Sequence, residues 1–281
     1  MRLALVIACV LVCAQGIALD LTLYINKGEL DFSGSAVSVC AFNETETLDS
    51  KNAIIELEID ELLNLTVINN DSLTHDFTID GVLDADNEIA GYSQETFQLS
   101  FDELGAWRFY SSASYGEFIG ATGTINVGLT EEACFFWNLF DLNKELTHDL
   151  ASAELESIPS EYLPELFFIN GDHFPNSLED EDALVSVELG DTCYITIVNG
   201  GNMDHVMHFH GFHAEIVSAQ VASDRVGWSK DTVPIKKGEA MVLKLVANLE
   251  GVYPVHDHNL IAVTNTGFYP GGMITQIHVG Q

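Results

Sequence analysis

The sequence repeats itself once, and this repeat constrains the fold more than any other feature. Residues 75–81 align with residues 205–211, and residues 105–112 align with residues 251–258. In both copies a glycine and a largely apolar run that ends in valine follow the second block. A segment that recurs in this way is one structural unit used twice. The sequence therefore predicts two copies of a single domain.

Short alternating or apolar runs, bounded by Gly, Asn or Asp, fill both copies and are typical of an antiparallel β-sandwich. The predicted strands lie at residues 54–59, 63–68, 122–127, 183–187, 193–198, 241–246 and 273–279. Near residues 130–163 the alternation is lost and helix formers occur, up to Pro159 and Pro164. We therefore predict an all-β chain with an N-terminal domain at 19–128, a partly helical connector at 129–164 and a C-terminal domain at 165–281.

The first 18 residues have the pattern of a signal peptide. A basic residue precedes an apolar run, and Gly16 and Ala18 offer a cleavage site. The run is short for a membrane span, and no later stretch reaches the ~20 apolar residues that a spanning helix needs. We expect an exported protein, secreted or periplasmic. Cys40, Cys134 and Cys193 then remain in the mature chain, and their pairing stays open.

The formal charge is −33, from 43 Asp and Glu against 10 Lys and Arg. Phosphate backbones require clustered basic residues, so this charge excludes nucleic acid as a partner. An anionic membrane surface would repel the chain as well. Apolar residue types make up 47% of the sequence, which is enough for a packed core and argues against disorder. A strongly negative surface attracts cations instead.

The second copy contains two H-x-H pairs, which are candidate metal ligands: His208 with His210, and His256 with His258. In a strand, residues two apart point to the same face of the sheet. If the two strands are neighbours, four imidazoles converge. Neutral imidazole is a preferred ligand of copper, zinc and nickel. We predict a metal site at these four histidines, with His205 as a further candidate ligand.

The second copy resembles the last domain of multicopper oxidases. Residues 205–211 are similar to the H-P-x-H-x-H-G segment of that family, and residues 256–258 with 272–273 are similar to its H-C-H and G-M segments. Residues 258–261 are similar to a segment of copper nitrite reductases that gives one histidine to a type 2 copper. The first copy resembles a cupredoxin.

This resemblance implies two cupredoxin-like Greek-key β-sandwiches and copper as the metal. Zinc is the alternative, because imidazole ligands do not distinguish the two metals.

The sequence departs from the family at the type 1 copper ligands, which are His, Cys, His and usually Met. In the first copy these positions hold His75, Ser111, Gly116 and Ala121. In the second copy they hold His205, Asp257, Ala262 and Met273. We therefore expect no blue copper centre in either domain and no electron path through a thiolate.

A trinuclear copper cluster takes four histidines from each of two domains. The second copy supplies its four, but the matching positions of the first copy are Thr78, Asp80, Tyr110 and Ser112. The ligand count therefore allows one metal ion or two. The trimeric two-domain members of the family imply a homotrimer in which Asp80 of a neighbouring subunit adds an oxygen ligand. The alternative for Asp80 is a turn residue before Gly81.

Two functions stay open. The first is an exported copper protein that acts as an oxidoreductase through a type 2-like histidine site, with a small-molecule oxidant or electron donor as partner. The second is a non-enzymatic copper or zinc binder, a carrier or an interaction protein on the same scaffold. An enzyme needs an open position on the metal, whereas a carrier binds tightly without turnover.

Overall fold

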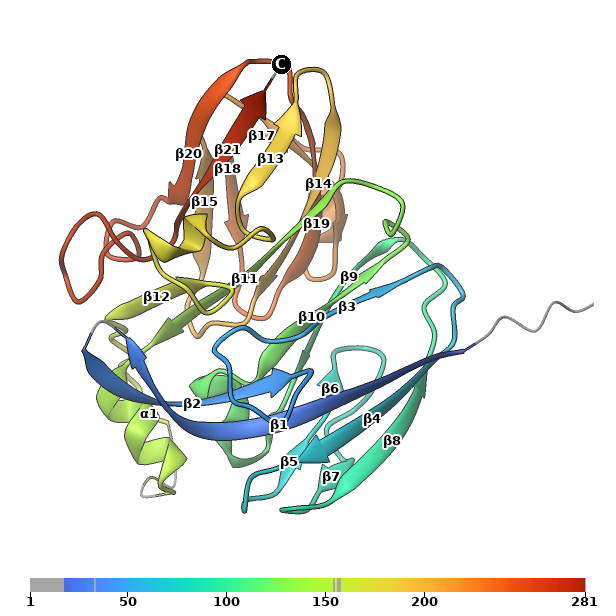
Figure 1. The fold of residues 1–281 in the computed structure, drawn as a ribbon, viewed down its shortest axis with the longest axis vertical. Helices are drawn as coiled ribbons and strands as arrows, with labels where there is room; N and C mark the ends of the chain where they lie inside the picture. The colour runs from blue at the N-terminus through green and yellow to red at the C-terminus, as the bar shows by residue number, and fades with distance from the viewer. Residues whose placement is uncertain (1–17, 33, 154, 156–157, 281) are drawn as a thin grey trace, which may run out of the picture.

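The computed structural model describes residues 18–32, 34–153, 155 and 158–280. The predicted signal peptide falls on residues that lie outside this range, apart from Ala18. Two β-sandwiches are stacked along the long axis of the molecule, with the second half of the chain above the first (Figure 1). This arrangement confirms the predicted all-β fold with two cupredoxin-like sandwiches.

The first sandwich is built from two four-stranded sheets and a small strand pair. One sheet has the order β2(Ser35–Asn43), β1(Leu19–Phe32), β4(Leu63–Asn69) and β8(Gln94–Leu99). The other has the order β3(Ile54–Leu57), β10(Thr122–Val127), β9(Gly105–Tyr110) and β6(Thr78–Ile79). The small pair is β5(His75–Asp76) with β7(Glu88–Ile89), and the 3-10 helix η1(Ala113–Ile119) follows β9. Aromatic rings between the sheets, among them Phe42, Phe77 and Phe109, form the core.

The second sandwich is larger. Its six-stranded sheet has the order β12(Leu166–Ile169), β11(Cys134–Leu142), β14(Thr192–Asn199), β19(Ala240–Val246), β16(Ala214–Ala219) and β17(Ser229–Lys230). Its five-stranded sheet has the order β13(Val185–Glu188), β21(Ile274–Gly280), β20(Gly251–Asp257), β15(His205–Phe209) and β18(Thr232–Ile235). The 3-10 helices η2(Asn176–Leu178) and η3(Ser223–Arg225) lie in its connections. The seven predicted strands correspond to strands of the structure with ends that differ by at most two residues.

The connector contains the helix α1(Lys144–Ala151), whose N-terminus is capped by Asn143 through the Leu146 amide. The residues just before it differ from the sequence-based expectation. Residues 134–142 form β11, which pairs in parallel with β14 and belongs to the six-stranded sheet. The strand is buried on both faces from Phe136 to Leu142, so its sequence is largely apolar and shows no alternation. Because the alternation is absent, the sequence of this segment does not predict a strand.

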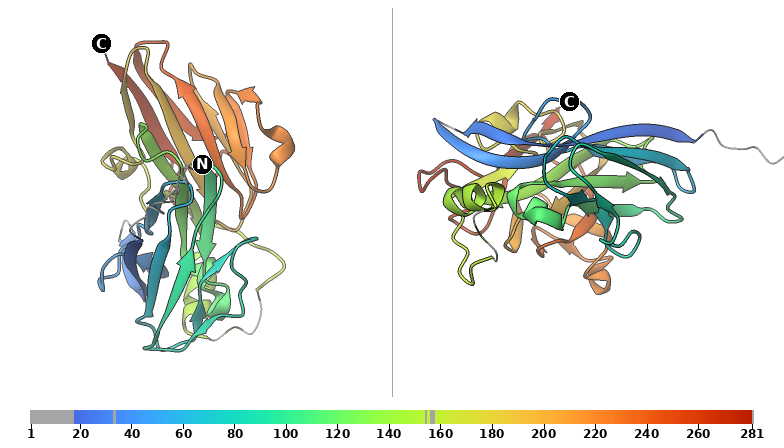
Figure 2. Two further views of the ribbon diagram at one scale, coloured as in Figure 1. Left: turned by 90° about the vertical axis from the view of Figure 1, so that its right-hand side faces the viewer. Right: turned by 90° about the horizontal axis from the view of Figure 1, so that it is seen from below.

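The two sandwiches share an extensive contact. Strand β9 of the first packs against β14, β16 and β19 of the second, around a small apolar cluster that includes Ala106, Val198 and Val242. A buried hydrogen bond from Thr196 Oγ1 to Asn126 Oδ1 crosses the same boundary. Figure 2 shows the two halves in contact from the side and from below. The second sandwich therefore packs directly against the first.

Within the described residues, no helix is long and apolar enough to cross a membrane. Cys40, Cys134 and Cys193 all carry free thiols. Burial raises the pKa of each thiol to about 12. These thiols are therefore protonated at neutral pH and weakly reactive.

Candidate metal centre

Four imidazole rings gather on the outer face of the five-stranded sheet. Strands β15 and β20 are antiparallel neighbours, and His208 lies directly opposite His256. His210 follows β15 and His258 follows β20, so each lies on the same face as its partner two residues earlier. The ring centroid of His208 is 4.8 Å from that of His210, 5.6 Å from His256 and 5.7 Å from His258. We refer to these four rings as the histidine cluster.

Two rings of the cluster are oriented by hydrogen bonds through Nδ1. His208 Nδ1 lies 3.1 Å from the carbonyl oxygen of Asp231 and 2.9 Å from Thr232 Oγ1. His256 Nδ1 lies 2.9 Å from the carbonyl oxygen of Asp257. An Nδ1–H that donates to a carbonyl leaves the lone pair on Nε2. This is how metal-binding histidines are commonly held, with one nitrogen fixed by the protein and the other free for the ion.

The distance between two ligand nitrogens shows whether the cluster fits a metal ion. His210 Nε2 and His256 Nε2 lie 3.1 Å apart. Two nitrogens that each lie about 2.0–2.1 Å from one ion, at angles of about 90–110°, are separated by about 2.8–3.4 Å. Partial burial, together with neighbouring His208 and His256, lowers the pKa of His210, which favours the neutral, ligating form. The donor set and this pair of nitrogens therefore fit a copper or zinc ion.

The cluster is not assembled for three ligands as it stands. Among the residues that the structure describes, no group of three or more His, Cys, Asp or Glu side chains is placed to hold one metal ion. His210 and His258 are exposed, while His208 and His256 are half-buried. Binding by a third nitrogen would therefore require a ring to rotate about its side-chain torsions.

His205 lies apart from the cluster. It is fully buried, and both ring nitrogens are engaged: Nδ1 is 2.5 Å from Asp257 Oδ2, and Nε2 is 3.1 Å from Asp141 Oδ2. Burial by itself lowers the pKa of His205, but the hydrogen bonds and charges of Asp141 and Asp257 outweigh it and raise the pKa to about 9. The ring is thus an imidazolium at neutral pH, and these contacts do not favour the predicted role of His205 as a ligand.

Asp141 was not singled out from the sequence. It lies on β11, is fully buried, and its Oδ2 also accepts hydrogen bonds from the amides of Asn202 and Met203. The sequence does contain one indication of its importance: an acidic residue within a largely apolar run must find polar partners if the run is buried. Its partner could not be read from the sequence, since His205 is 64 residues away.

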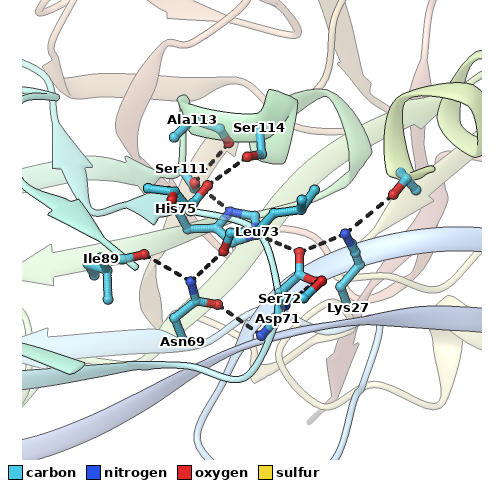
Figure 3. Close-up of polar contacts among 12 residues, drawn as sticks. Lys27, Asn69, Asp71, Ser72, Leu73, His75, Ile89, Ser111, Ala113 and Ser114 are labelled. Atoms are coloured by element: carbon cyan, nitrogen blue, oxygen red, sulfur yellow. Dashed lines mark hydrogen bonds and ion pairs between the residues drawn. The ribbon is translucent and has the colours of Figure 1, made fainter. Parts of the chain in front are cut away.

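The equivalent position in the first sandwich is also a buried polar network (Figure 3). His75 Nδ1 is 2.9 Å from Ser111 Oγ, and His75 Nε2 is 3.0 Å from Asp71 Oδ2. Lys27 Nζ forms an ion pair with the same carboxylate at 2.7 Å. The order Ser, His, Asp is that of a hydrolase triad, but Ser111 and His75 have no exposed surface, so no substrate can reach the hydroxyl. A Cβ at Gly116 would approach Ser111 to 2.9 Å, which leaves no room for a side chain there.

Aspartates of the first sandwich engage the residues that stand at the family's other copper-ligand positions. Thr78 and Ser112 both donate hydrogen bonds to Asp76 Oδ2, at 3.1 and 2.6 Å. The Tyr110 hydroxyl donates to Asp80 Oδ1 at 2.8 Å. Burial and the Asp80 carboxylate raise the pKa of Tyr110. These contacts compete with any metal for the same oxygens.

Arg108 contacts both Tyr110 and Asp80. Its guanidinium carbon lies 3.8 Å from the centre of the Tyr110 ring, and Nη2 lies 3.6 Å from Asp80 Oδ2. The Asp80 side chain nevertheless keeps 62% of its surface exposed. The predicted contribution of Asp80 to the site of a neighbouring subunit stays a prediction.

The fold matches solved copper proteins over most of the chain. The multicopper oxidase mgLAC superposes with a TM-score of 0.76 at 19% identity, covering 94% of this chain and 86% of its own. The blue copper oxidase from Nitrosomonas europaea gives 0.75 at 18% identity, with the same 94% and 86% coverage. The copper nitrite reductase from Nitrosomonas europaea gives 0.71 at 16% identity, covering 94% and 95%. The chain therefore has the two-domain cupredoxin fold of these proteins.

In the second half of the chain, the sequence as well as the fold is similar to these proteins. Residues 152–274 match the multicopper oxidase family model. No curated protein matches the chain. Over residues 152–274 the chain is thus similar in sequence to the multicopper oxidases, and the matched residues include the whole histidine cluster.

Proposed function

We propose that this chain is an exported copper-binding protein in which the histidine cluster holds the ion. The ligands would be His208, His210, His256 and His258. The observation that carries the proposal is the 3.1 Å separation of His210 Nε2 and His256 Nε2 within a group of four imidazoles on paired strands. A bound copper ion of this kind supplies one-electron chemistry at a site of type 2 character.

The chain's own residues favour reaction directly at the cluster. His208 and His256 are oriented by carbonyl oxygens, while the exposed His210 and His258 face solvent. In a single subunit, a small oxidant or electron donor would approach from that side without passing through the protein. Asp257 occupies the position where the resemblance places the thiolate, so transfer from a blue copper centre is not part of this proposal.

A second candidate is a copper or zinc carrier without turnover. One observation favours it: Thr78, Tyr110 and Ser112 of the first sandwich are engaged by aspartates, so that sandwich offers few donors for a second metal. A single ion on imidazole ligands is sufficient for binding and delivery. The two candidates share the site and differ only in whether a substrate reacts there.

Metal analysis and electron paramagnetic resonance of the purified protein test both candidates. Copper at one equivalent or more, lost in His208→Ala and His256→Ala, supports the proposed site. Oxygen uptake or nitrite turnover with an electron donor that depends on the same two residues favours the oxidoreductase. Stoichiometric copper without turnover favours the carrier, and zinc as the isolated metal makes it a zinc protein. Wild-type protein that binds neither metal overturns the proposal.

Localisation and assembly are parts of the same proposal. We propose secretion or export to the periplasm, and a homotrimer in which a neighbouring first domain covers the cluster. The charge of −33 would draw cations toward the site, so copper uptake should slow as ionic strength rises. Detection of the processed chain outside the cytoplasm and the mass of the native assembly check these two points.

A further inference from the structure

Asp257 lies between two members of the histidine cluster in sequence but on the opposite face of the sheet. Strand side chains alternate, so His256 and His258 point outward and Asp257 points inward. The Asp257 side chain has no exposed surface. It stands directly opposite Met207 on β15, the strand that leads into His208 and His210. A buried carboxylate at this point must be fully partnered.

The partners of Asp257 are the backbone groups next to the cluster. Its Oδ1 accepts hydrogen bonds from the amide of Asn259, at 2.7 Å, and from the amide of Val206, at 3.3 Å. Asn259 directly follows His258, and Val206 lies two residues before His208. The His258 amide in turn donates to the carbonyl of Val206 at 2.7 Å. One carboxylate therefore joins the ends of both ligand-bearing strands.

The inward side of Asp257 is anchored to the core. Its Oδ2 meets His205 Nδ1 at 2.5 Å, and His205 Nε2 meets Asp141 on β11, a strand of the opposite sheet. All three side chains are fully buried. Ligands must be held to within about 0.5 Å for a productive metal site, and this requires supporting residues that are themselves fixed.

We propose that Asp257 is a positioning residue for the copper site, fixing His258 and strand β15 relative to each other through the amides of Asn259 and Val206. The inference rests on the proposed function, because it concerns the ligands assigned there. It also goes beyond that function: Asp257, which occupies the family's cysteine position, supports the histidine cluster from the inner face of the sheet and does not bind the metal.

Three variants test this role by copper titration, by the hyperfine splitting of bound Cu(II) and by thermal unfolding. In Asp257→Ala we expect copper affinity to fall by about 10–100-fold and the hyperfine splitting to change. Asp257→Asn keeps an oxygen for the two amides, so its affinity should recover to within about threefold of wild type. Asp71→Ala is the matched control, because it removes a buried carboxylate partner of a buried histidine, His75, in the other sandwich and away from the cluster strands. It should lower the melting temperature while affinity and hyperfine splitting stay at the wild-type values.

The proposal is overturned if Asp257→Ala binds copper as wild type does, or if Asp71→Ala loses as much affinity as Asp257→Ala. If Asp257→Ala does not fold, hydrogen exchange of the wild-type protein decides the matter. Copper should then slow exchange of the Asn259 and Val206 amides, and unchanged exchange would count against the proposal. Failure of the proposed function is distinguishable, since the wild-type protein would then bind no copper.

Discussion

The buried imidazolium of His205 predicts how stability depends on pH in the metal-free protein. The pKa of His205 is raised from 6.5 to about 9 by Asp141 and Asp257. A folded-state pKa above the unfolded value stabilises the fold fully below the unfolded pKa, and the contribution is lost as pH rises through the folded pKa. Stability should therefore fall between pH 6.5 and 9.

The magnitude follows from the same values. One pKa unit corresponds to about 1.4 kcal/mol, so His205 contributes about 3 kcal/mol at or below pH 6.5 and only about 0.4 kcal/mol at pH 9. For a chain of 281 residues, an unfolding entropy of about 0.6 kcal/mol/K converts the difference into roughly 4 °C of melting temperature.

Differential scanning calorimetry of wild type and His205→Gln across this pH range measures the effect. Glutamine does not titrate, so the variant carries every other pH-dependent contribution of the acidic surface. We expect the melting temperature of wild type to fall by about 4 °C more than that of the variant. Equal slopes for the two proteins would refute the reasoning, because the imidazolium would then contribute nothing to the fold.

Three further outcomes are expected. His256→Ala should weaken Cu(II) binding at least about tenfold because it removes an oriented ligand, whereas His213→Ala, at an exposed histidine outside the cluster, should leave the titration curve unchanged. The Cu(II)-loaded protein should show no strong absorption at ~600 nm, since Asp257 is not a thiolate; an intense blue colour would contradict this. Gly201→Ala should destabilise the protein by about 1–3 kcal/mol in urea unfolding, because its Cβ would approach Asp141 Oδ2 to 2.1 Å; an unchanged midpoint would show that the carboxylate can move.

The sequence predicted more of the fold than of the site. Runs with alternating burial, such as residues 63–69 of β4, were recognisable because one side of each strand faces water. Strand β11 was missed because it is buried on both faces, and its apolar run has no period. The fold class did not depend on this error, since the repeat already required two similar sandwiches.

The sequence by itself determined that His208 shares a face with His210, and His256 with His258, because the side chains of a strand alternate with a period of two. Only the tertiary structure decided that β15 and β20 are neighbours, which turns two pairs into one cluster. It also decided that His205 lies between two buried carboxylates, one of them from a strand in the opposite sheet. Contacts of that kind depend on packing across the core, which local periodicity does not encode.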